Sequence, residues 1–283
     1  MTAAVIDTNS ARMPGIIYGT AWKKDATETL VRAALEAGFR GIDTACQPKH
    51  YFEPGVGAAI ASALEGGVKR DDLYVQTKFT PLGGQDPAQI PYDSRAPLAA
   101  QIKQSCEVSL TNLRTSYLDC LVLHSPLANA RQTLDAWHAM ESLVDAGLVR
   151  GLGISNCYRL EQFEQLHHAA RIKPSVLQNR FCADTDYDRD LRSFCRRHSI
   201  VYQSFWTLTA NPHVLSHKIV QARARQYHCA PEQIVFRYLT HCGVVPLTGT
   251  KSLEHMRADL AIFDFSLTAA EQAQVGAVFD RHS

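Results

Sequence analysis

From residue 16 onward the chain alternates between short apolar runs and longer segments with helical periodicity. Short runs rich in β-branched residues that end in polar residues predict buried strands, whereas apolar residues spaced three and four apart predict amphipathic helices. Residues 27–38 show the helical pattern, and Gly38 supplies the expected helix end. The eight predicted strands cover residues 16–20, 40–45, 73–79, 118–125, 149–156, 175–180, 200–205 and 244–249.

A regular alternation of strands and helices predicts parallel strands joined by crossover helices. Eight such strands can close into a (β/α)8 barrel, which has a typical length of about 250 residues. A doubly wound open sheet is the alternative, but that fold usually carries a G-x-G-x-x-G motif after its first strand. The sequence GLGISN at residues 151–156 fails at the last position of this motif. We therefore predict an α/β protein with a single-domain (β/α)8 TIM barrel.

The two ends of the chain lie outside this alternation. Residues 1–12 hold little apolar sequence and are predicted to be a flexible lead-in, extended or disordered, to a barrel domain that spans residues 13–283. Residues 267–283 contain an additional C-terminal helix, in which Thr268 and Glu271 form a capping box. We expect this helix to pack on the exterior or the floor of the barrel.

Charge and cysteine content narrow the class of protein. The 283 residues include 29 Lys and Arg against 28 Asp and Glu, a balance that disfavours nucleic acid or an anionic membrane as the partner. No apolar stretch approaches the roughly 20 residues of a membrane helix. The first residues do not resemble a secretory signal, so a cytoplasmic protein is expected. Eight cysteines without a C-x-x-C pair favour reduced core thiols over a disulfide framework or a zinc site.

Polar residues end several of the predicted strands. Asp43, Lys78 and His124 end three consecutive strands, and in a closed barrel these ends meet at one mouth. Each residue alone has a structural explanation: the Asp could cap a turn, the Lys could extend to solvent, and the His could be a satisfied interior side chain. Together they favour a functional site, because unpaired charges near a core are costly. Later strands end in further polar residues: Ser155, Asn156 and Gln178.

A paired Lys and Asp beside a His have a definite chemical use. The cation, held by Asp43, can lower the pKa of a nearby phenol from its free value of about 10. A neutral imidazole can orient a carbonyl oxygen, and the phenol can protonate that oxygen as hydride arrives. Tyr51 follows the second predicted strand, but it is one of ten tyrosines, so its position alone does not select it.

Several segments between Met13 and Phe279 resemble the aldo-keto reductase superfamily, whose members are NAD(P)H-dependent carbonyl reductases on a (β/α)8 barrel. The resemblance implies the same fold and an oxidoreductase activity for this chain. The segments that carry it are MPGIIYGTAW (13–22), GIDTA (41–45), TKF (77–79), LVLHSP (121–126), WHAMESLVDAGLVRGLGISN (137–156) and FDFSLTAAE (263–271).

The resemblance assigns a catalytic tetrad of Asp43, Tyr51, Lys78 and His124. In the family the tyrosine follows the aspartate by about five residues, a spacing that here falls on Pro48. Tyr51 lies eight residues after Asp43, in a loop that is slightly longer than usual. We predict that Tyr51 is the proton donor to the carbonyl oxygen.

The same resemblance implies a bound NADPH, with NADH as the alternative cofactor. Ser155, Asn156 and Gln178 match residues that bind the nicotinamide carboxamide, and Phe205 matches an aromatic that stacks on the nicotinamide ring. Trp206, Thr207 and Leu208 replace the S-P-L that is common in the family, so the pyrophosphate loop that follows them, residues 209–211, is altered. The predicted cofactor-binding residues are Gly19, Thr20, Asp43, Ser155, Asn156, Gln178, Phe205, Trp206, Leu208, Thr248, Gly249, Thr250, Lys251, His255 and Asp259.

The sequence departs most from the family at the adenosine end of this set. Leu247 stands where members that prefer NADPH usually carry a lysine, and two residues are added to the segment that follows. His255 and Asp259 replace the usual Arg and Asn, or Arg257 compensates for the Arg instead. Residues 248–252 still form a strand-to-helix turn that can offer backbone amides to a phosphate. Lys251 could bind the 2′-phosphate, which favours NADPH over NADH.

The expected substrate is a small aldehyde or ketone of modest polarity, with Trp22, Tyr51 and His124 as the substrate-binding residues. We expect a monomer without a metal, nucleic-acid or membrane partner. A regulatory subunit that binds the cofactor with little turnover is the alternative. A metal-dependent barrel hydrolase would need H-x-H after its first strand, which the sequence lacks.

Overall fold

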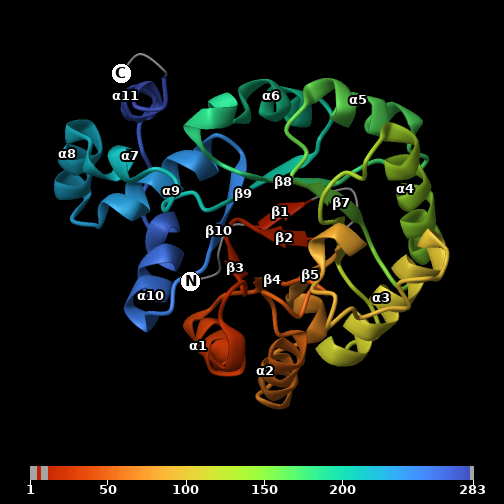
Figure 1. Ribbon diagram of the computed structural model, residues 1–283. Helices are drawn as coiled ribbons and strands as arrows, with labels where there is room; N and C mark the ends of the chain where they lie inside the picture. The colour runs from red at the N-terminus through yellow and green to blue at the C-terminus, as the bar shows by residue number, and fades with distance from the viewer. Residues whose placement is uncertain (1–4, 8–11, 281–283) are drawn as a thin grey trace.

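The computed structural model describes residues 5–7 and 12–280, and in them eight parallel strands form a closed barrel (Figure 1). Around the barrel the strands follow chain order, and β10 pairs with β3 to close the ring. The prediction of a (β/α)8 barrel is confirmed, and each predicted strand contains an observed one. The strands are β3 Ile17–Gly19, β4 Gly41–Asp43, β5 Tyr74–Phe79, β6 Cys120–Leu123, β7 Leu152–Ser155, β8 Val176–Arg180, β9 Val201–Phe205 and β10 Val244–Thr248.

Helices cover the outside of the ring (Figure 1). In α1 the buried face contains Val31, Ala34 and Leu35, and each large apolar side chain buried in this way contributes about 1.5–3 kcal/mol. Gly38 ends α1 in the left-handed conformation with a φ of 120°, as predicted. The helices are α1 Thr27–Ala37, α2 Glu53–Glu65, α3 Leu98–Leu113, α4 Ala130–Asp145, α5 Leu160–Ala169, α6 Arg189–Arg197, α7 Pro212–Ser216, α8 Lys218–Tyr227, α9 Pro231–His241, α10 Leu253–Leu260 and α11 Ala269–Ala277.

A short antiparallel sheet, which the sequence pattern does not predict, precedes the barrel. β1 (Val5–Asp7) pairs with β2 (Arg12–Pro14). Met13 is buried in the barrel interior against Tyr74 and Val176, which begin their strands, so β2 covers the floor of the barrel. The lead-in that we predict to be flexible also includes residues 1–4 and 8–11, which lie outside the described residues.

The C-terminal helix lies on the exterior of the barrel, where α11 contacts α8 and α9. The predicted capping box is present: the Thr268 amide donates to Glu271 Oε2 at 2.8 Å, and the Glu271 amide donates to Thr268 Oγ1 at 3.3 Å. Phe279, just beyond the helix, stacks on Tyr238 with ring centroids 5.4 Å apart. These contacts fix α11 and Phe279 to the helices on the outside of the barrel.

In the described part of the chain, no helix has the length and apolar character that would be required to span a bilayer. The same residues contain no cluster of three His, Cys, Asp or Glu side chains suited to a metal ion. With β2 over the floor, the polar residues at the strand ends face the opposite mouth.

Candidate active site

A buried ion pair forms the base of the site. Lys78, on β5, donates from Nζ to both carboxylate oxygens of Asp43 on β4, at 2.7 and 2.6 Å, and to the backbone oxygen of Thr44 at 2.8 Å. Both charged side chains are almost fully buried. In such a position each charge depends on its partner, because removing one leaves the other uncompensated.

Three glutamines inside the barrel support this pair. Gln76 and Gln178 each donate from Nε2 to Asp43 Oδ1, at 2.6 and 2.9 Å. Both also donate to the side-chain oxygen of Gln203, and Gln203 donates back to Gln76 Oε1. The Asp43 carboxylate therefore accepts hydrogen bonds from one ammonium and two amides. This network fixes the carboxylate, and through it the position of Lys78.

Tyr51 is held in the loop between β4 and α2. Its backbone amide and that of His50 donate to the Gln47 carbonyl, and the His50 carbonyl accepts from the Trp22 amide at 2.7 Å. The Lys78 ammonium lies 5.1 Å from the centroid of the Tyr51 ring, and the rings of Tyr51 and His124 are 6.0 Å apart. The lengthened loop thus returns the tyrosine to the other three predicted catalytic residues.

The pKa values of Tyr51 and Lys78 differ in part from the expectation drawn from the sequence. Burial raises the pKa of the Tyr51 phenol above its ordinary value, and the Lys78 ammonium opposes this rise without cancelling it. The expectation of a pKa below the free value is therefore wrong for this site, because desolvation outweighs the cation. For Lys78, burial disfavours the charge, but Asp43 and Tyr51 raise its pKa above that of an ordinary lysine. Because both pKa values are raised, the Tyr51 phenol stays protonated and the Lys78 ammonium stays charged at neutral pH.

His124 follows β6 and is kept neutral. Burial, followed by the charges of Lys78 and His50, lowers the pKa of His124 to about 3. Its Nδ1 lies 2.6 Å from the hydroxyl of Thr80, and its backbone carbonyl accepts from the Asn156 side chain at 2.8 Å. Thr80 follows β5, in a segment that the sequence analysis did not assign to the site. A neutral ring held on one side can present the other nitrogen to a carbonyl group.

A cavity of about 710 Å³ extends from these residues across the barrel mouth. Its size lies within the ordinary range for ligand sites. Most of the predicted site residues line it: Gly19, Trp22, Asp43, Tyr51, His124, Ser155, Asn156, Gln178, Phe205, Trp206, Leu208, Thr248, Gly249, Thr250, His255 and Asp259.

Three predicted residues do not line the cavity. Lys78 lies beneath it, bound to Asp43. Thr20 is buried and donates from its hydroxyl to the backbone oxygen of Asp43, so it joins β3 to β4. Lys251 is exposed to solvent outside the cavity wall. The cation predicted for the 2′-phosphate is thus near the cavity in sequence but not part of its wall.

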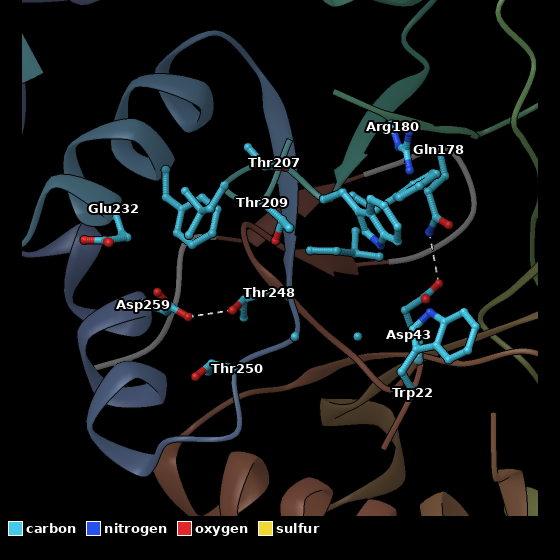
Figure 2. Close-up of a pocket in the computed structure, with 18 of the residues that line it drawn as sticks. Trp22, Asp43, Gln178, Arg180, Thr207, Thr209, Glu232, Thr248, Thr250 and Asp259 are labelled. Carbon is cyan, nitrogen blue, oxygen red and sulfur yellow. Dashed lines mark hydrogen bonds between the residues drawn. The ribbon is translucent and has the colours of Figure 1, made fainter. Parts of the chain in front are cut away.

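The far end of the cavity is acidic (Figure 2). Thr248 donates to Asp259 Oδ2 at 2.7 Å, and burial raises the pKa of Asp259 to about 6. Glu232, at the start of α9, lines the same region. Lys23, which the sequence analysis did not single out, is buried next to it and donates to the Gly249 carbonyl at 2.8 Å. Burial and the charge of Lys251 lower the pKa of Lys23 to about 8.

Sequence reasoning missed Gln76, Gln203, Thr80 and Arg180. The two glutamines meet across the barrel although 127 residues separate them, so no local pattern links them. Thr80 lies two residues after Lys78, directly after the TKF motif, and this adjacency is the available signal for it. Arg180 is likewise two residues beyond Gln178 on β8, on the same side of the strand.

Comparison with known proteins agrees with this fold. Residues 15–279 match the model of the aldo/keto reductase family. Methylglyoxal reductase DkgA of Yersinia pestis is 29% identical over 87% of this chain and 81% of its own length, and aldo-keto reductase family 1 member A1-A of Danio rerio is 28% identical over 95% and 87%. An aldo-keto reductase structure from a deep-sea metagenome library is 26% identical with a TM-score of 0.80, over 94% of this chain and 91% of that one. A Bombyx mori aldo-keto reductase in complex with NADP has a TM-score of 0.83 at 24% identity, over 99% and 95%, and this likeness shows the fold.

The fold and the family match therefore define a (β/α)8-barrel oxidoreductase that acts on small carbonyl compounds. The chain belongs to the aldo/keto reductase family.

Proposed function

We propose that this protein reduces an aldehyde or ketone to an alcohol with NADPH, and that Tyr51 is the proton donor. The observation that carries the proposal is the buried Asp43–Lys78 pair beneath a protonated phenol, beside a neutral His124, on one cavity. A bound reduced nicotinamide supplies the hydride that the carbonyl carbon accepts. The residues of the chain must then provide the proton and the geometry.

The proton comes from the Tyr51 hydroxyl and goes to the carbonyl oxygen. The phenolate that forms would be unfavourable in a buried position, but the Lys78 ammonium lies beside the ring and stabilises the negative charge. Asp43 holds that ammonium in place through two hydrogen bonds. Lys78 therefore makes Tyr51 more acidic than an equally buried phenol without a cation.

His124 orients the substrate in this proposal. The Thr80 hydroxyl has no other hydrogen bond among the described residues, so it can donate to Nδ1 of the neutral ring. In that tautomer Nε2 carries the hydrogen and can donate to the carbonyl oxygen that Tyr51 protonates. Two donors then converge on one oxygen.

The donor groups at this end of the cavity fit a nicotinamide carboxamide. Asn156 uses its amide hydrogens on the His124 carbonyl and Ser155 Oγ, and Gln178 uses its own on Asp43 and Gln203. The Gln178 oxygen remains to accept from the carboxamide NH2, and the Asn156 oxygen, which accepts from the Tyr158 hydroxyl at 3.2 Å, has a second lone pair for it. The Ser155 hydroxyl can donate to the carboxamide oxygen. Phe205, at the end of β9, lines the same part of the cavity and can contact the ring.

The test measures oxidation of NADPH with a panel of aldehydes, ketones and quinones, together with NADPH affinity by nucleotide fluorescence. Wild-type protein is expected to consume NADPH. Tyr51→Phe should bind NADPH as wild type does and lose at least about 100-fold in turnover, because the acid is missing. Tyr117→Phe, a change of a half-buried tyrosine that does not line the cavity and whose hydroxyl bonds Asp71, is the matched control and should keep full turnover.

Two results would contradict the proposal. Full activity of Tyr51→Phe would exclude this phenol as the donor. Tight binding of NADPH without reduction of any carbonyl compound would favour a regulatory subunit of the same fold.

A further inference from the structure

The main cavity continues into a second one beside the end of β8. This second cavity has a volume of about 350 Å³. Asn156, Arg180 and Phe205 line both spaces, and Asn156 bonds the backbone of His124. The junction therefore lies at the hydride-transfer end of the site. Four further residues line the second cavity: Tyr158, Cys182, Asp184 and Thr185.

Arg180 is placed to reach a substrate. Successive side chains of a strand alternate between its two faces, so Arg180 lies on the same face of β8 as Gln178. Gln178 points into the barrel and donates to Asp43 at 2.9 Å. Figure 2 shows Arg180 next to Gln178, across the cavity from Thr250 and Asp259 at the adenosine end. Its charge therefore belongs to the end of the cavity where the carbonyl group must sit.

The Arg180 guanidinium is fixed by an aromatic ring and not by a carboxylate. Its central carbon lies 4.1 Å from the centroid of the Trp206 ring. Within the described residues, its nitrogens make neither an ion pair nor a hydrogen bond to a protein acceptor. By contrast, Arg150 and Arg189 are each bound by two aspartates. Stacking leaves the N–H edge of a guanidinium free, and that edge matches the two oxygens of a carboxylate.

Asp184 is the charge that opposes an anion here. It also lines the second cavity, but it is exposed to solvent and forms no ion pair with Arg180. Water screens an exposed carboxylate strongly, whereas Arg180 is half-buried and held in one orientation by Trp206. The guanidinium therefore determines the sign of the charge that this cavity accepts.

We propose that the second cavity is a substrate subsite in which Arg180 binds a carboxylate, so that the substrates are aldehydes or ketones that carry an acid group. The inference rests on the proposed reductase activity and narrows its substrate class. It departs from the sequence expectation of a substrate of modest polarity, which did not take Arg180 into account.

The test compares ω-oxo carboxylic acids of increasing chain length with their neutral methyl esters. For wild type, kcat/KM is expected to be at least about 10-fold higher for the best acid than for its ester, the value of a charge-assisted hydrogen bond. Arg180→Met should remove this preference and leave kcat/KM for the ester within about twofold, and Arg180→Lys should restore part of it. Asp184→Asn should increase kcat/KM for the acid by a small factor. Arg131→Met, a change of an exposed arginine on α4, should alter nothing.

Other readouts separate this inference from its alternatives. Equal losses for acid and ester in Arg180→Met would show a structural role, and a weaker NADPH affinity would assign Arg180 to the cofactor; either result overturns the inference. If wild type reduces no carbonyl compound, the proposed function fails, and binding of hexanoate to the NADPH-loaded protein decides the inference alone. Binding that is lost in Arg180→Met supports a carboxylate subsite, and absence of binding to wild type overturns it.

Discussion

The two ends of the cavity treat charge in opposite ways. At the end that we propose for hydride transfer, Asp43 and Lys78 are buried as a pair, and two glutamines complete the bonding of the carboxylate. At the end that we propose for the adenosine of the cofactor, here called the adenosine end, Asp259 is buried with one hydroxyl partner, and Lys251 lies outside the wall. Asp43 and Lys78 lie on strands of the barrel, whereas the second end is formed by the last residue of β10, the turn that follows it, and α10, which carries Asp259. Paired charges on rigid strands hold the fixed geometry that catalysis requires. A segment whose charged groups have fewer partners within the protein can instead bind a group that a ligand brings with it.

The largest effect is expected for Lys78→Met. Loss of the ammonium leaves Asp43 buried without a cation, so the free energy of unfolding should fall by about 3–5 kcal/mol at pH 7. Because the folded protein raises the pKa of Lys78, this stabilisation is fully present below the ordinary lysine pKa and is lost only at higher pH. Denaturant unfolding measures the change. Lys69→Met, in an exposed segment, is the control, and an unchanged stability of Lys78→Met would mean that the pair is not needed for the fold.

Asp259→Asn tests the other end and should act in the opposite direction. The folded protein raises the pKa of Asp259 from 3.8 to about 6, so the ionised group disfavours folding above that pH. The difference corresponds to at most about 3 kcal/mol. An asparagine can still accept the Thr248 hydrogen bond, so the variant should be more stable than wild type at pH 8 and equal to it at pH 4.

Chemical denaturation at both pH values measures this difference. Asp264→Asn, a change of an exposed aspartate, should have no such pH dependence. A stabilisation of Asp259→Asn that is the same at pH 4 and pH 8 would mean that desolvation of the carboxylate is not its cause.

The contrast also explains what the sequence could predict. Asp43, Lys78 and His124 sit at the ends of strands, where the apolar pattern fixes both the element and the direction of its polar end. The structure brings all three together with Tyr51, despite its longer loop: Asp43, Tyr51 and His124 line one cavity, and Lys78 lies beneath it. Whether they perform the proposed roles remains a prediction that the Tyr51→Phe and Lys78→Met variants test.

Other features had no local signal. Gln76 and Gln203 bond across the barrel, so their partnership depends on closure of the sheet and not on neighbouring residues. The raised pKa of Tyr51 also depends on burial, which sequence spacing does not measure. At the adenosine end, a turn with altered length hides which side chains reach the wall, and Lys251 does not.

Thr80→Val tests whether the fixed geometry around Asp43 and Lys78 extends to His124. The variant keeps the shape of the side chain but removes the hydroxyl at 2.6 Å from His124 Nδ1. Loss of one hydrogen bond that fixes the tautomer should lower kcat about fivefold to tenfold, a cost of about 1 kcal/mol. NADPH affinity should not change, and Thr80→Ser should retain wild-type kcat. A change in NADPH affinity in place of kcat would assign Thr80 to the cofactor site.

The smallest effect is expected for Lys251→Ala, because this lysine is exposed and outside the cavity wall. A surface ion pair contributes about 0.2–1 kcal/mol, so NADPH affinity should weaken no more than about fivefold and NADH affinity should stay the same. Lys69→Ala is the matched control. Lys251→Ala also removes a charge that lowers the pKa of Lys23, so the pKa of Lys23 should rise from about 8. Nucleotide fluorescence titrations at pH 7 and pH 9 measure both affinities. Equal losses of affinity for both nucleotides would exclude Lys251 from recognition of the 2′-phosphate. A large loss confined to NADPH would mean that the turn closes on its ligand. The two ends of the cavity would then be equally ordered when the cofactor is bound.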